Sequence, residues 1–315
     1  MASLMEDQAS GLRRIFALAS RQSGPLAISF VGGVLGQGGG DALIGRNTIV
    51  AELARALATQ GKEVLIIDEN HGPDSVASAF GLTTRFDLMQ AVNCDVPAHQ
   101  VVLQAEPAIR IVPAARVARE SARLDAMQQR AVSEWLRRLQ KNVDVVLIDS
   151  AMKSNGFSFL HPSSSRVVVV AAENSVAIKS AYGHIKRLAK QEPTRSFDVV
   201  VACMSTLQEG EIVFENINQV AQEYLGLALS FLGCISLRRD ANFFSTGYQT
   251  VAEALLHAGG SVRRDFSQRF GLGQHEKNEK NLVSHSRVSR SEGVDRLASH
   301  LQATHLQTVL ADPVL

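Results

Sequence analysis

Glycines are frequent between residues 33 and 45, in the segment that links the first apolar run of the chain to the next amphipathic stretch. Residues 40–47, GDALIGRN, have the spacing of the phosphate loop G-x-x-x-x-G-K-[ST], with arginine and asparagine in place of the lysine and the hydroxyl residue. In such a loop, consecutive backbone N–H groups surround an anion and the next helix directs its N-terminus at it. We therefore predict a nucleotide-phosphate site at Gly40, Gly45, Arg46, Asn47 and Thr48. The alternative is a glycine-rich turn that binds no ligand.

Two aspartates, Asp68 and Asp149, end apolar runs farther along the chain. Carboxylates at such strand ends hold Mg²⁺ through water or position an attacking water in nucleotide hydrolases. We therefore predict that both are remnants of a catalytic, Mg²⁺-positioning set. Asn70 stands where a second acid would act, and an amide cannot serve as a base. The alternative for each aspartate is an ordinary strand-end residue that caps the next loop.

Hydrophobic patterning predicts the elements that position these residues. Six apolar, β-branched runs predict buried strands at 26–33, 62–70, 143–150, 166–173, 197–204 and 229–236. Amphipathic stretches predict helices at 47–60, 122–141, 176–190 and 211–226. In the second helix we expect Met127, Ala131 and Trp135 to face the core. The alternation predicts an α/β fold, a doubly wound and mostly parallel sheet with helices on both faces.

The composition of the chain limits which partners and which cellular compartment we expect. The 315 residues carry a net charge of only +1, which gives no general attraction to nucleic acid, so no direct nucleic-acid partner is expected. Three distant cysteines predict buried free thiols in a reducing compartment. No long apolar run is present near the N-terminus, and the histidines lack metal-ligand spacing, so we expect a cytoplasmic protein without a metal site.

Changes in composition along the chain predict three parts. Residues 1–24 contain an amphipathic helix at 6–21, and residues 25–258 form the sheet domain. Residues 259–315 are polar and predict a flexible tail that ends in an amphipathic helix at 293–310. The lysines and arginines of this tail are diluted by acids, so any attachment to an anionic membrane surface is expected to be weak.

Three segments resemble those of the MinD/ParA-type ATPases, the deviant Walker-A class. They are GKEVLIIDENHG at 61–72, NVDVVLIDS at 142–150 and VVVVAAENSVAIKSAYGHIKRL at 167–188, and the resemblance extends over roughly 26–255. It implies a MinD-like P-loop NTPase fold, ATP or ADP with Mg²⁺ as cofactor, and an ATP-dependent homodimer. Asp41 and Arg46 stand where the class has its two loop lysines. Their presence predicts weak or absent hydrolysis, with nucleotide binding without turnover left open.

The segment DQASGLR at 7–13 resembles the N-terminal D-Q-A-x-x-L-R motif of FlhG proteins, also called FleN or YlxH, which set flagellar number and placement. The resemblance implies that Asp7, Gln8, Ala9, Leu12 and Arg13 bind the GTPase FlhF, and that the glutamine promotes its GTP hydrolysis. It also implies a flagellar transcription activator as a further partner, and contact of the C-terminal helix with the inner face of the cell membrane. Two alternatives are an active ATPase that positions cargo by dimerising on ATP, and a non-enzymatic anti-activator.

Overall fold

The architecture is a single eight-stranded sheet flanked by helices. The structure is a computed structural model that describes residues 24–32, 45–152, 156–163, 165–203, 207–236 and 244–257. The strand order is β3-β4-β2-β5-β1-β6-β7-β8, and every neighbouring pair is parallel except β3 and β4. The predicted α/β fold with a doubly wound, mostly parallel sheet is therefore confirmed.

The strands are short apolar runs. Their bounds are β1 Leu26–Gly32, β2 Val64–Asp68, β3 Leu103–Glu106, β4 Ile109–Pro113, β5 Val145–Asp149, β6 Arg166–Ala172, β7 Phe197–Cys203 and β8 Ser230–Ser236. All residues of β2 and β5 are buried, because these two strands lie inside the sheet and are covered on both faces.

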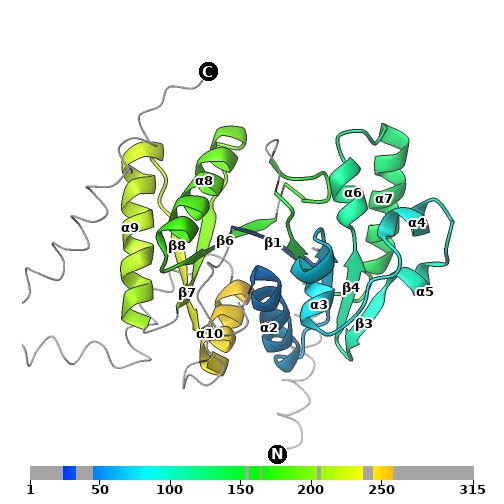
Figure 1. The fold of residues 1–315 in the computed structure, drawn as a ribbon, viewed down its shortest axis with the longest axis horizontal. Helices are drawn as coiled ribbons and strands as arrows, with labels where there is room; N and C mark the ends of the chain where they lie inside the picture. Colours follow the sequence, from blue (N-terminus) through cyan, green and yellow to red (C-terminus); the bar gives the residue numbers. More distant parts are fainter. Residues whose placement is uncertain are drawn as a thin grey trace, which may run out of the picture. The chain divides into compact units, whose positions relative to one another are not determined.

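The described helices cover both faces of the sheet (Figure 1). Their bounds are α2 Arg46–Thr59, η1 Gly72–Asp74, α3 Val76–Ala79, α4 Leu88–Val92, α5 Ala98–Val101, α6 Ala115–Glu120, α7 Ala126–Leu139, α8 Ser175–Gln191, α9 Leu207–Leu225 and α10 Phe244–Leu256. Helices α2, α3 and α10 pack on one face of the sheet, over side chains such as Ile66 of β2. The other face is covered by α8 and α9 over β6 and β7, and by α4, α6 and α7 over β2, β4 and β5. Val64 and Ile66 of β2 pack on one face of the sheet, and Leu65 and Ile67 pack on the other, which explains why these successive positions are all apolar.

This topology brings three strand ends together. Strand β5 lies between β2 and β1, and Asp149 is in register with both Asp68 and Phe30. Strand β1 ends at Gly32, whose φ is +91° and where a Cβ would lie 2.6 Å from the carbonyl oxygen of Val170. Only glycine fits at that position. The carboxyl ends of β1, β2 and β5 therefore form one edge, where ligands bind in open α/β sheets.

The structure also departs from the sequence-based expectations. Strands β3 and β4 were not predicted, because β3 is half polar and Arg110 interrupts the apolar run of β4. The predicted core face of α7 is confirmed for Trp135, which packs against the core, and wrong for Met127, which is 80% exposed, and for Ala131, which is exposed. The buried residues Val132 and Leu136 were not predicted. The expectation that all cysteines are buried is wrong for Cys94, which is exposed. Within the described part of the chain, no helix is long and apolar enough to cross a membrane.

Candidate functional site

Arg46 is the first residue of α2, and its side chain returns to the edge formed by the strand ends. Its guanidinium donates from Nε to Oδ1 of Asp149 at 2.5 Å, from Nη1 to the carbonyl oxygen of Gly32 at 3.0 Å, and from Nη2 to that of Ser150 at 2.7 Å. Its side chain is 16% exposed and that of Asp149 is 1% exposed. A fixed cation thus joins the ends of β1 and β5, with three oxygen acceptors around it.

Asp149 has a donor on each of its carboxylate oxygens. Arg46 occupies Oδ1, and the amide Nδ2 of Asn70 donates to Oδ2 at 2.8 Å and to the Asp149 carbonyl oxygen at 3.0 Å. Burial raises the pKa of Asp149, against the opposing effects of Arg46 and Asn70. A cation or a water at this carboxylate would therefore have to share its oxygens with these two donors.

Asp68 is fully buried beside Asp149 and is bonded to backbone. Its Oδ1 accepts from the N–H of Asn70 at 3.1 Å, and its Oδ2 accepts from the N–H of Ala77 at 3.2 Å. Burial first, and then the negative charge of Asp149, raise the pKa of Asp68 to about 7. This carboxyl holds the loop between β2 and α3, which is the loop-capping alternative that the sequence left open.

Asn47 ties the start of α2 to that same loop. Its Nδ2 donates to the carbonyl oxygens of Pro73 at 2.9 Å and Ser75 at 3.1 Å, while its Oδ1 accepts from the N–H of Thr48 at 2.9 Å. A Cβ on Gly45 would meet Oδ1 of Asn47, so a larger residue there would require the Asn47 side chain to move. The side chain that replaces the loop hydroxyl is therefore used for local structure.

A second polar cluster behind the strand ends was not predicted from the sequence. Glu69, 2% exposed, accepts at Oε1 from the Ser158 hydroxyl at 2.5 Å and lies 3.1 Å from Nε2 of His161. Its Oε2 accepts from the N–H of Ala151 at 3.0 Å, and Nδ1 of His161 lies 2.8 Å from Oγ of Ser29. Burial alone would raise the pKa of Glu69, but the hydrogen bonds from His161 and Ser158 outweigh it and lower that pKa. No local signal marks this cluster, since Glu69 and His161 are 92 residues apart.

The structure thus brings most of the predicted site residues to one edge of the sheet. Gly45, Arg46, Asn47, Asp68 and Asp149 lie around the carboxyl ends of β1, β2 and β5, and Thr48 follows in α2. Gly40 and the predicted partner-binding residues at 7–13 lie outside the described residues. Within the described ranges, no group of three histidine, cysteine or acidic side chains is arranged to hold a metal ion.

A comparison with known protein families shows the family to which this chain belongs. The family described as cellulose biosynthesis protein BcsQ matches residues 31–201, which is more than half of the chain. This chain belongs to that family. The matched region contains Arg46, Asp68 and Asp149, so the candidate site lies within the part that defines the family.

Two curated relatives are named for regulatory roles. The antiactivator FleN of Pseudomonas aeruginosa is 28% identical over 199 residues, which cover 62% of this chain and 71% of FleN. The flagellum site-determining protein YlxH of Helicobacter pylori is 23% identical over 212 residues, 65% of this chain and 69% of YlxH. The resemblance to the FlhG/FleN (YlxH) group within the MinD/ParA type is confirmed.

Solved structures agree on the fold. The MinC:MinD cell division protein complex of Aquifex aeolicus matches with a TM-score of 0.52 at 19% identity, over 73% of this chain and 96% of that chain. Cobyrinic acid a,c-diamide synthase of Mycobacterium smegmatis, solved with ADP and magnesium, matches with a TM-score of 0.55 at 21% identity, over 75% and 97%. The predicted MinD-like P-loop NTPase fold is therefore confirmed.

Proposed function

We propose that this protein regulates flagellar number or placement by binding partner proteins, on a MinD-like scaffold that does not hydrolyse ATP at an appreciable rate. The relationship to FleN and YlxH supports the process. The contacts of Asp149 support the absence of turnover, and they are the observation that carries the proposal.

The side chains present do not fit Mg²⁺-dependent hydrolysis. Mg²⁺ takes carboxylate and water oxygens in octahedral geometry, and the phosphate-loop hydroxyl normally joins them. Here the cationic guanidinium of Arg46 pairs with Asp149, Asn70 donates to its other oxygen, and Asn47 is bonded to the loop of Pro73. Asn70 cannot act as a base. ATP or ADP is therefore proposed at most as a ligand that is bound without turnover, although a protein with the same fold holds an ATP analog and magnesium.

The partner that we propose first is an FlhF-type GTPase. Asp7, Gln8, Ala9, Leu12 and Arg13 reproduce the motif that binds this GTPase in the FlhG group. The chain would present this segment and accelerate GTP hydrolysis by the partner, with Gln8 acting at the partner's site. Homodimerisation, and weak attachment of 293–310 to the membrane surface, are secondary parts of the same proposal.

A phosphate-release assay tests this role. The full-length protein is mixed with an FlhF-type GTPase and GTP, and we expect faster phosphate release that is lost in Gln8→Ala. The Asp149→Asn variant is the matched control, because it changes the scaffold site alone and should stimulate like the wild type. Unchanged hydrolysis with the wild-type protein would refute the proposal. An ATPase activity that is abolished by Asp149→Ala would instead favour the cargo-positioning ATPase.

A second candidate function is non-enzymatic restraint of a flagellar transcription activator. The specific observation in its favour is the 28% identity to a protein named antiactivator. It predicts that the purified chain binds such an activator without added nucleotide and lowers transcription from its promoter in vitro. An activator that works equally well with and without the chain would eliminate this candidate.

A further inference from the structure

Positive charge is concentrated in residues 110–141. This segment has eight arginines and lysines against three acids, a net charge of +5, whereas the whole chain carries +1 and the rest of it therefore −4. Seven of the eight basic residues are arginine. A local excess on a nearly neutral chain attracts an acidic group at short range without general attraction to polyanions.

The fold displays this charge on the outer side of α6 and α7. Helix α7 buries Val132 and Leu136 against the sheet, and a capping box of Asp125 and Gln128 fixes where it begins. The opposite side of the helix faces solvent. The exposed basic residues of the segment are Arg116, Arg119, Arg123, Arg130, Arg137, Arg138 and Lys141.

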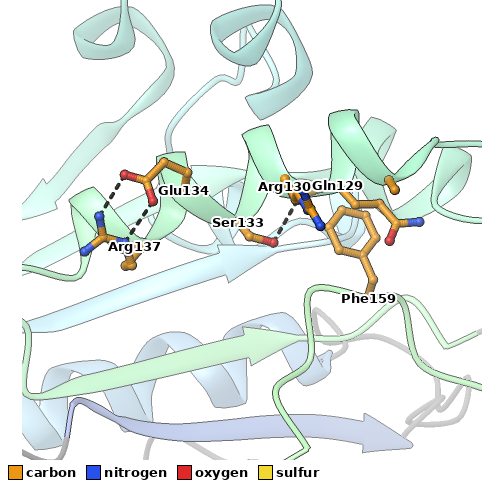
Figure 2. A pocket seen from close by; sticks show the side chains of 7 residues that line it. Gln129, Arg130, Ser133, Glu134, Arg137 and Phe159 are labelled. Atoms are coloured by element: carbon orange, nitrogen blue, oxygen red, sulfur yellow. Dashed lines mark hydrogen bonds and ion pairs between the residues drawn. The ribbon is translucent and has the colours of Figure 1, made fainter.

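An open hollow of about 690 Å³ follows that outer side of α7 (Figure 2). Arg130, Ser133 and Arg137 lie three and four residues apart, so they form one stripe along the helix. Phe159, from the segment that follows β5, lines the same hollow and reaches toward Arg130 in Figure 2. Met127, 80% exposed, lies one turn before Arg130. The surface therefore combines guanidinium groups with apolar contact area.

The exposed arginines of this segment outnumber the acidic side chains that pair with them. Glu134 accepts from Nε and Nη2 of Arg137 at 2.9 and 2.8 Å and from Arg138 at 3.3 Å. Among the described residues, the side chains of Arg123 and Arg130 have neither a hydrogen bond nor an ion pair. Glu134 lines the hollow and is shared by Arg137 and Arg138, whereas Arg130 in the same hollow lacks an acid in the part of the chain that the structure describes, which leaves capacity for carboxylates from another molecule.

We propose that this arginine face (Met127, Arg130, Ser133, Arg137 and Phe159) docks an acidic segment of a partner protein with an apolar side chain between its carboxylates. Arginine binds carboxylates through two parallel N–H donors, which explains arginine instead of lysine. The chain as a whole carries a net charge of only +1, which favours a short acidic segment over the long polyanion of a nucleic acid. The proposal goes beyond the GTPase-activating role, because it uses neither residues 7–13 nor the strand-end site.

The spacing of the arginines defines the occupant. Arg130 and Arg137 are seven residues apart in α7, which corresponds to about 10 Å along the helix axis. An extended chain covers this length in about three residues. The partner segment should therefore carry two acids about three residues apart, or about two turns apart if it is helical, with the apolar side chain entering the hollow.

Fluorescence anisotropy with the full-length protein tests the proposal. The probe is a labelled peptide with two glutamates three residues apart and a leucine between them, and the matched probe has glutamines instead. We expect the glutamate peptide to bind about tenfold more tightly than the glutamine peptide, with an affinity that falls as salt is added. Arg130→Glu with Arg137→Glu should lower its affinity at least about tenfold.

The control variant carries Lys179→Glu with Lys190→Glu, which makes the same charge change at exposed positions of α8. It should bind the peptide like the wild type, and circular dichroism should show both variants folded. If the arginine variant bound the glutamate peptide as tightly as the wild type, the proposal would be overturned. An equal loss of affinity in the arginine variant and the lysine control would also overturn it. Tighter, arginine-dependent binding of a DNA duplex or of phosphatidylglycerol vesicles would overturn the choice of a protein partner. The arginine variant should stimulate the GTPase as the wild type does. A failure of the docking proposal can therefore be distinguished from a failure of the proposed GTPase-activating role.

Discussion

Replacing Arg46 by methionine tests the central feature of the strand-end site. Methionine keeps an unbranched stem but removes the donors to Asp149, Gly32 and Ser150. Removing one partner of a buried ion pair costs about 3–5 kcal/mol. The 16% exposure of Arg46 admits some water, and Asn70 still donates to Asp149, so we expect a loss of about 3 kcal/mol near pH 8.

The loss should depend on pH with a definite sign. Burial already raises the pKa of Asp149, and removing Arg46 raises it further, so the folded variant takes up a proton more readily than the unfolded chain. The folded state of Arg46→Met is therefore relatively more stable at low pH. The difference in unfolding free energy between wild type and variant should shrink as the pH falls from 8 to 5.

Urea denaturation followed through the fluorescence of the single tryptophan, Trp135, measures this effect. A loss of about 3 kcal/mol corresponds to a shift of the urea midpoint by about 1 M. The control is Arg46→Met combined with Asp149→Asn, which removes both charges and should recover most of the loss. An unchanged midpoint in Arg46→Met, or no recovery in the double variant, would refute the inferred role of the ion pair.

Three further predictions concern the buried polar groups and the helix packing. The pKa of Asp68, about 7 against 3.8 when unfolded, means that its protonated form stabilises the fold, so unfolding free energy should fall by up to about 4 kcal/mol between pH 4 and pH 8. Denaturation series across that range should show this slope in the wild type, and an equal slope in Asp68→Asn would contradict the assignment. His161→Phe removes the ring donor to buried Glu69 and should cost about 3 kcal/mol in urea denaturation; a smaller effect than about 1 kcal/mol would show that the pair is dispensable. Gly210→Ala would press a methyl against two buried cysteine sulfurs and should cost about 1–3 kcal/mol, whereas Gly183→Ala, with open space around its Cβ, should raise the melting temperature; equal effects of the two would argue against tight packing under α9.

Much of the fold follows from local sequence patterns. The six apolar runs and the four long amphipathic stretches correspond to strands and helices of the structure within a few residues. The strand ends then predict that Asp68, Asp149 and the start of α2 share one edge, because parallel strands end on the same side. Strands β3 and β4 give no clear apolar run, because polar residues make up half of β3 and Arg110 interrupts β4. The core face of α7 was predicted only in part, because Trp135 packs against the core whereas Met127 and Ala131 are exposed.

The sequence by itself determined the sheet architecture, the location of the candidate site and the replacement of its lysine, hydroxyl and second acid. Only the tertiary structure decided what those replacements do: Arg46 binds Asp149, 103 residues away in the sequence, and Asn70 binds the same carboxylate, 79 residues away. The tertiary structure also joined His161 to Ser29, 132 residues away. These contacts depend on the order β2-β5-β1, which sets strands from distant parts of the chain side by side. Local patterns report which face of an element is apolar, but they do not report which polar side chains the sheet brings within hydrogen-bond distance.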